Sequence, residues 1–134
     1  MPPATLYQVV AAVMEHEGRV LICQRRAGDR HPLKWEFPGG KVEPGETPRA
    51  ALERELREEL AVAASIGPEI ARYQYTYTGR APVLLIFHRV SQWQGEPRNL
   101  AFTEIRWEAI ERLPEYDFLE GDVELVRRLA RGQC

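Results

Sequence analysis

The sequence predicts an α+β domain in which helices pack on a mixed β-sheet. Two apolar runs, 9–14 and 20–23, flank a short polar turn and predict a hairpin, and the most apolar segment, 83–90, predicts another buried strand. Two other segments, 48–60 and 122–131, carry apolar residues at helical spacing. No internal repeat or linker interrupts the chain, so we expect one domain over residues 1–134.

The composition is that of an ordinary globular protein. Hydrophobic residues make up 44% of the chain and charged residues 28%. The 18 basic and 20 acidic residues leave a net charge of −2. This balance predicts no general attraction to a nucleic acid polymer, so any nucleotide that binds should be small.

Cysteine usage and hydropathy predict a cytoplasmic protein. Cys23 lies in an apolar run and Cys134 is the last residue, so we expect no structural disulfide, as in a reducing compartment. The amino-terminal residues show no basic stretch followed by an apolar core, and no apolar run approaches the roughly 20 residues of a membrane span. We therefore expect no membrane partner, and the protein is either a monomer or a homodimer.

Two segments before the first helix are candidates for ligand contact. Arg25 and Arg26 close the second strand, where they either form a solubilising edge or hold phosphate oxygens. Trp35 and Phe37 alternate with Glu36 in a short extended piece. One face of that piece can pack in the core while the other meets a ligand, and core packing alone is the alternative.

A tyrosine stripe follows the first helix. Tyr73, Tyr75 and Tyr77 recur at a period of two and therefore lie on one face of a predicted strand. The stripe is either a half-buried sheet face or a platform on which a base stacks.

The first predicted helix carries an acidic ridge beside its core stripe. The stripe consists of Leu52, Leu56 and Leu60. Glu55 faces Glu58 and Glu59 at the i+3 and i+4 positions, where each like-charged pair costs about 0.2–0.5 kcal/mol. A cation should therefore sit at the ridge, and carboxylate oxygens suit Mg²⁺ or Mn²⁺. The alternative is a solvated acidic face.

The turn before this helix supports a metal site. The sequence Phe-Pro-Gly-Gly at 37–40 contains two glycines that are free to adopt positive φ and so to aim a backbone carbonyl at the same cation. Thr47 is predicted to cap the helix and Pro48 to be its first residue.

These segments resemble the Nudix hydrolase family, whose signature is G-x5-E-x7-R-E-U-x-E-E-x-G-U with U a bulky aliphatic residue. The matching residues are Gly40, Glu46, Arg54, Glu55, Leu56, Glu58, Glu59 and Val62. Ala61 departs from the signature, which has glycine there, at the end of the helix where glycine helps the chain turn. Residues 35–43 and 113–129 further resemble the MutT-like branch. The resemblance implies a Nudix fold, an α/β/α sandwich with a central mixed β-sheet.

The resemblance also implies an activity and a set of site residues. The activity is Mg²⁺-dependent hydrolysis of (deoxy)nucleoside triphosphates to a monophosphate and pyrophosphate. Glu55, Glu58, Glu59 and the Gly39 carbonyl would bind the metal, and Arg54 would orient the glutamates. Glu46 would act through water or hold the loop, and Lys41 would contact phosphate. Glu104 matches a further ligand or base in some members, although it could equally be an exposed strand residue.

Asp122 stands where the branch commonly carries a residue that faces the base, and it could equally cap the last helix. An ionised aspartate only accepts hydrogen bonds, which favours cytosine or guanine over thymine. The expected substrates are therefore damaged nucleotides such as 8-oxo-dGTP, or cytidine nucleotides. The alternatives are another nucleoside diphosphate derivative, such as a dinucleoside polyphosphate or a nucleotide sugar, and a nucleotide-sensing module without turnover.

Overall fold

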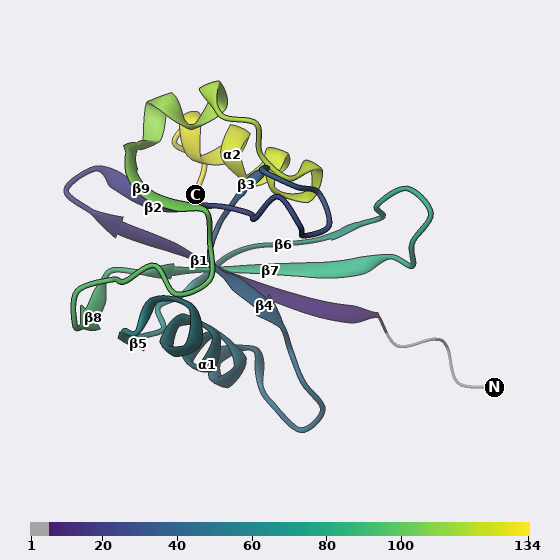
Figure 1. Ribbon diagram of the computed structural model, residues 1–134, viewed down its shortest axis with the longest axis horizontal. Helices are drawn as coiled ribbons and strands as arrows, with labels where there is room; N and C mark the ends of the chain where they lie inside the picture. The colour runs from purple at the N-terminus through teal and green to yellow at the C-terminus, as the bar shows by residue number, and fades with distance from the viewer. Residues whose placement is uncertain (1–5) are drawn as a thin grey trace.

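The computed structural model describes residues 6–134, in which a mixed sheet lies between two helical layers (Figure 1). The strands are β1 (Tyr7–His16), β2 (Arg19–Gln24), β3 (Trp35–Glu36), β4 (Gly39–Lys41), β5 (Ala63–Ser65), β6 (Glu69–Tyr75), β7 (Val83–Val90), β8 (Gln92–Gln94) and β9 (Glu104–Ala109). The helices are α1 (Pro48–Leu60) and α2 (Val123–Ala130), with 3-10 turns η1 (Ile110–Glu115) and η2 (Glu120–Asp122). The expectation about the amino-terminal sequence falls largely on residues 1–5, outside the described part.

Strand β1 is the centre of the sheet. It runs parallel to β7 from Tyr7↔Val83 to Met14↔Val90. Along its other edge it pairs antiparallel first with β4 and then with β2. The predicted hairpin is confirmed: β1 and β2 are joined by Glu17 and Gly18, both with positive φ, as a two-residue hairpin turn requires.

Both faces of the sheet are buried, which explains the continuous apolar runs. On β1, Val10, Ala12 and Met14 pack toward α1, while Ala11 and Val13 pack toward α2 and η1. The α1 side also buries the predicted stripe of Leu52, Leu56 and Leu60. In Figure 1, α1 lies below the sheet and α2 with the 3-10 turns lies above it. The predicted α/β/α arrangement is confirmed.

Helix α1 begins and ends as the sequence predicts, with one strained position. Thr47 Oγ1 accepts a hydrogen bond from the Ala50 amide at 3.1 Å, and Pro48 is the first helical residue. Ala61 adopts the left-handed conformation with φ 58°, which favours glycine because a side chain crowds the backbone there. The helix exit is therefore preserved, although alanine occupies it at a conformational cost.

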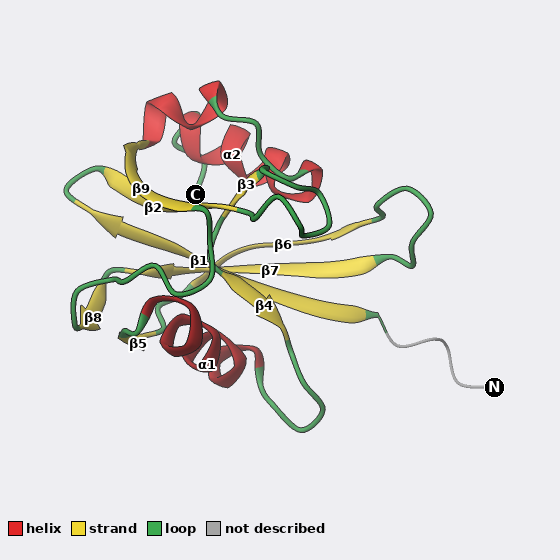
Figure 2. Cartoon of the chain, viewed as in Figure 1, coloured by secondary structure: helices red, strands yellow, loops and turns green. Residues whose placement is uncertain are grey.

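The carboxy-terminal third follows the prediction with small shifts. The last helix, expected over 122–131, is α2 (Val123–Ala130). The 3-10 helix η1 runs through Pro114 to Glu115, because proline removes one donor without preventing a tight turn. Figure 2 shows the loops after β2 and β6 at one end of the sheet. None of the helices in residues 6–134 has the length and apolarity to cross a bilayer.

Candidate active site

A cleft of about 450 Å³ opens beside the edge of the sheet where β1 meets β4. Its walls come from segments far apart in the chain: Val9, Ala11, Arg25, Arg30, His31, Glu36, Phe37, Gly39, Gly40, Lys41, Glu59, Tyr77, Arg80, Val83, Leu85, Phe87, Leu119 and Asp122, among others. One end is polar and backed by α1. The other is apolar and contains the buried Asp122 carboxyl.

At the polar end, two α1 glutamates lie against the glycine turn. The Gly39 amide donates a hydrogen bond to Glu59 Oε1 at 3.0 Å. A β-carbon on Gly40 would lie only 2.6 Å from the Glu55 carboxyl carbon, so any other residue there would displace the Glu55 carboxylate from its present position. Of the two glycines that are free to adopt positive φ, Gly39 does so, at φ 155°, and Gly40 does not. A β-carbon on Gly39 would collide with the Val10 carbonyl of β1.

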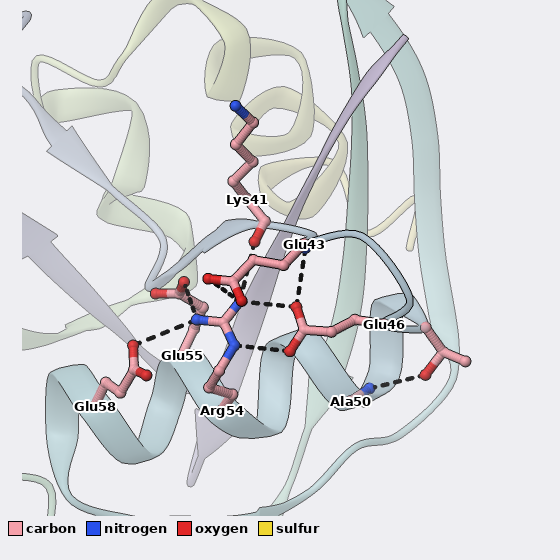
Figure 3. Close-up of polar contacts among 8 residues, drawn as sticks. Lys41, Glu43, Glu46, Ala50, Arg54, Glu55 and Glu58 are labelled. Atoms are coloured by element: carbon pink, nitrogen blue, oxygen red, sulfur yellow. Dashed lines mark hydrogen bonds and ion pairs between the residues drawn. The ribbon is translucent and has the colours of Figure 1, made fainter. Parts of the chain in front are cut away.

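Arg54 holds the acidic residues around it (Figure 3). Its guanidinium grips Glu46 in a two-point contact at 2.7 and 2.9 Å. It also donates to Glu55 at 2.8 Å and to the half-exposed Glu58 at 3.3 Å. The Lys41 carbonyl accepts a further bond at 3.1 Å. Arg54 therefore ties the loop before α1 to the helix and orients two of the predicted metal ligands.

The Arg54 contact and a loop amide together fix Glu46. The hydrogen bonds from Arg54, helped by the Glu43 amide at 2.9 Å, lower the pKa of Glu46 to about 2. Glu46 thus stays ionised and holds the loop, one of the two roles considered for it. Its carboxylate faces Arg54 and Glu43 (Figure 3).

Partial burial makes Glu55 and Glu59 costly to ionise. Burial, followed by the nearby Glu55 and Glu36 carboxylates, raises the pKa of Glu59 to about 9. Burial also raises the pKa of Glu55, although the bond from Arg54 opposes the shift. Carboxyl groups that are costly to ionise together would be stabilised by a cation.

The donor set fits a hard divalent ion, because Glu55, Glu58 and Glu59 offer carboxylate oxygens and the turn offers backbone carbonyls. Within residues 6–134 no three acidic, histidine or cysteine side chains already stand in metal-ligand geometry. Instead, Arg54 engages Glu55 and Glu58, and the Gly39 amide engages Glu59. These three glutamates are the residues that could hold a metal, once they turn from their protein partners.

The cleft also contains an ion pair that the sequence did not indicate. Arg25 Nη1 contacts Glu36 at 3.0 Å, and Arg25 Nε donates to the Arg30 carbonyl at 2.7 Å. Burial raises the pKa of Glu36 despite the arginine. Arg25 therefore lines the cleft, as its predicted role of holding phosphate oxygens requires. In the alternating piece 35–37, Glu36 is the residue that faces the cleft between the two aromatic residues.

Asp122 reaches the apolar end of the cleft. Its side chain makes no capping hydrogen bond to α2. Its Oδ2 accepts a hydrogen bond from the Phe37 amide at 3.3 Å. Burial, with the nearby Glu36 charge, raises the pKa of Asp122 to about 8. Of the two alternatives for Asp122, the helix cap is thus wrong.

The segment before Asp122 is anchored to β3. The Trp35 amide donates to the Asp117 carbonyl at 2.9 Å, and the Leu119 amide donates to the Trp35 carbonyl at 2.9 Å. These bonds form a short parallel bridge between Trp35 and Phe118. They bring Leu119 and Asp122 to the cleft from the far end of the chain.

Besides Arg54, Glu55 and Glu58, three of the predicted site residues do not line this cleft. Trp35 is buried against Tyr116, with ring centroids 5.1 Å apart, so the core-packing alternative describes it. Arg26 is exposed in a turn closed by Asp29. Glu104 pairs with Arg106 at 2.5 Å on β9. Phe37, Lys41 and Asp122 do line it.

The cleft residues that were not among the predicted site residues include Glu36, His31, Tyr77 and Leu119. His31 and Tyr77 approach each other with ring centroids 4.9 Å apart, although one lies in the loop after β2 and the other after β6. No local spacing signals such a contact. Only for Glu36 was there a signal, because it alternates between two aromatic residues that were expected to pack.

Comparison with known proteins agrees with this geometry. The NUDIX domain model matches residues 5–129. The CTP pyrophosphohydrolase of Escherichia coli (strain K12) is 37% identical over 121 residues, covering 90% of this chain and 89% of the relative. The 8-oxo-dGTP diphosphatase of Haemophilus influenzae is 34% identical over 125 residues, covering 92% and 91%. The solution structure of the E. coli ORF135 protein, 36% identical, superposes with a TM-score of 0.82 over 91% of this chain and 86% of that one. Three predictions from the sequence are thereby confirmed: the family, the fold and the enzyme class, a hydrolase of phosphoric anhydrides. The chain belongs to the NUDIX family.

Proposed function

We propose that the protein is a Mg²⁺-dependent pyrophosphohydrolase that cleaves (deoxy)nucleoside triphosphates to a nucleoside monophosphate and pyrophosphate, with Mn²⁺ as an alternative ion. The names of its relatives indicate substrates of the 8-oxo-dGTP or CTP type. Removal of such nucleotides would sanitise the nucleotide pool.

The observation that carries this proposal is that one cleft joins two different environments. Glu59 and the Gly39–Gly40 backbone lie at its polar end, and Asp122 lies among apolar residues at the other. A volume of about 450 Å³ suits a small nucleotide. A charged polyphosphate and an apolar base need such a divided site.

At the polar end, Glu55, Glu58, Glu59 and the Gly39 carbonyl would hold the metal, and Arg54 would orient the glutamates from behind. A bound Mg²⁺ would neutralise charge on the phosphate oxygens and make a bound water more acidic. Lys41 and Arg25 line the same cleft and would contact phosphate oxygens.

At the apolar end, Asp122 would read the base as a neutral carboxyl, because its pKa near 8 keeps most of it protonated at pH 7. A neutral carboxyl donates one hydrogen bond and accepts others, whereas the sequence argument assumed an ionised group that only accepts. Guanine and cytosine each present a donor beside an acceptor on their Watson–Crick edge, but so does thymine, and a neutral carboxyl therefore does not by itself exclude thymine. Phe37, Leu85 and Phe87 provide apolar walls for the base.

We further propose that the whole chain is one domain and that the protein works in the cytoplasm as a monomer or homodimer. Its partner would be a nucleotide, and neither a nucleic acid polymer nor a membrane. Cys23 and Cys134 are both unpaired, which agrees with a reducing compartment. Catalysis by Glu104 and substrate contacts by Arg26 and Trp35 stay predictions from the sequence.

The test is pyrophosphate release over a panel of ribo- and deoxynucleoside triphosphates that includes 8-oxo-dGTP, with Mg²⁺, with Mn²⁺ and with EDTA. We expect metal-dependent release with one or a few preferred bases. Mass spectrometry of the products distinguishes this reaction from cleavage of a dinucleoside polyphosphate or nucleotide sugar, which yields two nucleoside or sugar phosphates. Binding of nucleotides without any turnover would instead support a sensing module.

A further inference from the structure

The tyrosine stripe forms a clamp on one peptide unit beside Asp122. Tyr73 Oη donates a hydrogen bond to the Gly121 carbonyl at 2.6 Å. The Gly121 amide donates to Tyr77 Oη at 3.2 Å. Two side chains from the β6 segment thus hold both polar groups of a single residue, 48 and 44 positions away along the chain.

The clamp requires glycine at position 121. A β-carbon there would lie under 3.0 Å from the Tyr77 hydroxyl and 3.0 Å from Leu85 Cδ1. Gly121 itself is buried. Any other residue would therefore displace either the Tyr77 ring or the segment itself, and the two hydroxyls could no longer hold both polar groups as they do here.

The next residue is Asp122, so the clamp acts on the proposed base-reading carboxyl. From the β3 side, the Phe37 amide holds Asp122 Oδ2 and the Trp35 carbonyl holds the Leu119 amide. From the β6 side, the two tyrosines hold Gly121. Asp122 is fixed between these supports, and its distance from the β7 wall of the cleft depends on both.

We propose that Tyr73 and Tyr77 are positioning residues that set base selectivity by holding the Gly121 peptide and, through it, the Asp122 carboxyl. This inference rests on the proposed function, since it concerns which nucleotide that function prefers. Tyr73 is the cleaner probe. It does not line the cleft, whereas Tyr77 does. Tyr73→Phe keeps the ring that packs on Phe87 and removes only the hydroxyl that holds the Gly121 carbonyl.

The chain offers a matched control on the same stripe. Tyr75 donates its hydroxyl bond to Glu120 Oε2 at 2.7 Å, without contact to Gly121. Tyr75→Phe removes the same atom as Tyr73→Phe from the same strand, although the Tyr75 hydroxyl bond is exposed and the Tyr73 bond is partly buried. The two variants therefore differ in which partner loses its hydrogen bond.

The experiment measures kcat and KM for the preferred triphosphate and for a poorly used one. Because each variant loses one hydrogen bond, we expect Tyr73→Phe to raise KM for the preferred nucleotide roughly 3- to 10-fold, with kcat within about twofold, and to lower discrimination by the same factor. Tyr77→Phe should act in the same direction, and Tyr75→Phe should leave both constants and the discrimination unchanged. Melting temperatures of all variants report any general loss of stability.

A double-mutant cycle separates positioning from a merely structural role. In an Asp122→Ala background, or Asp122→Asn if the alanine variant does not fold, Tyr73→Phe should no longer alter discrimination. The selectivity role of the clamp is contradicted by any of three outcomes: Tyr73→Phe still alters discrimination in that background, Tyr75→Phe has an equal effect, or Tyr73→Phe leaves discrimination unchanged. In each case the protein would still be an active hydrolase. A wild-type protein that releases no pyrophosphate from any nucleotide overturns the proposed function and the selectivity role together.

Discussion

The two ends of the cleft are built in different ways. The polar end is largely local: Gly39 and Glu59, which bond each other, are 20 positions apart, and one loop and one helix supply Glu46, Glu55, Glu58 and Glu59, while the nearby Glu36 comes from β3. The apolar end is assembled from distant segments, and Phe37 and Asp122, which bond each other, are 85 positions apart. The chemistry of the reaction thus resides in one segment, while the choice of substrate depends on the packing of the whole domain.

The sharpest way to test this division is Glu58→Gln at the polar end. We expect kcat to fall by at least about 10³-fold, because a direct metal ligand is lost. KM and base preference should change little, since Glu58 does not line the cleft that contains Asp122. The Glu58 side chain is 57% exposed, so the fold should be unaffected. Pyrophosphate release and melting temperature check both points.

The matched control is Glu53→Gln, on an exposed position of the same helix. It removes one negative charge from α1 without touching the acidic ridge, and turnover should stay at the wild-type value. Near-normal turnover in Glu58→Gln would remove that residue from the metal site.

A smaller loss is expected when the support of the polar end is altered. Arg54→Lys keeps the positive charge but loses the planar fork that reaches Glu46, Glu55 and Glu58 together. We expect a 10- to 100-fold lower kcat, in the range of about 10–100 typical for residues that orient metal ligands. The apparent affinity for Mg²⁺ should also fall, so that the variant needs a higher Mg²⁺ concentration to reach half of its maximal rate. Arg57→Lys, at an exposed site on the same helix, is the control.

The contrast between the two ends also explains what could be predicted from the sequence. Helical spacing placed Glu55, Glu58 and Glu59 beside the core leucines, and the Nudix resemblance placed Arg54 and Glu46 around them. These relations are local, so the periodicity of the chain contains them. The hairpin and the two-sided core were predictable for the same reason, since they follow from runs and alternation.

The other residues depended on tertiary contacts. That Trp35 packs in the core while Glu36 faces the cleft is decided by the segment 117–119, which pairs with Trp35 from the far end of the chain. The neutral state of Asp122 follows from its burial, and burial is not a property of the residue type. The role of the tyrosine stripe depends on its contact with the peptide group of Gly121, which lies more than 40 positions away along the chain.

At the apolar end, the burial of Asp122 should make the stability of the folded protein depend on pH. Below about pH 4, Asp122 is protonated in both the folded and the unfolded chain. Between there and its folded pKa of about 8, the unfolded chain ionises this carboxyl while the folded protein keeps it neutral, so folding loses stability as pH rises. Asp122→Asn cannot ionise, and its melting temperature relative to wild type should rise across that window, by about 5 °C or more.

Asp117→Asn is the control for this pH series, since Asp117 lies in the same segment but is 74% exposed and pairs with Lys34. The melting temperature of Asp117→Asn relative to wild type should not rise with pH across this window. A constant gap between Asp122→Asn and wild type from pH 4 to pH 9 would show that Asp122 is ionised in the folded protein, which would restore the acceptor-only reading of the base.

The smallest effect is expected at Glu104, which lies outside both ends of the cleft. Arg106 already neutralises its carboxylate at 2.5 Å, and the same guanidinium lies 5.2 Å from the Trp35 ring and bonds Tyr116. Glu104→Gln should therefore lower kcat by no more than about threefold, the worth of a single exposed ion pair. Arg106→Lys, which keeps the charge but loses the stacking on Trp35, is the informative partner variant. A loss with Glu104→Gln comparable to that with Glu58→Gln would mean that Glu104 leaves Arg106 and enters the cleft when substrate binds, and the polar end would then no longer be a largely local structure.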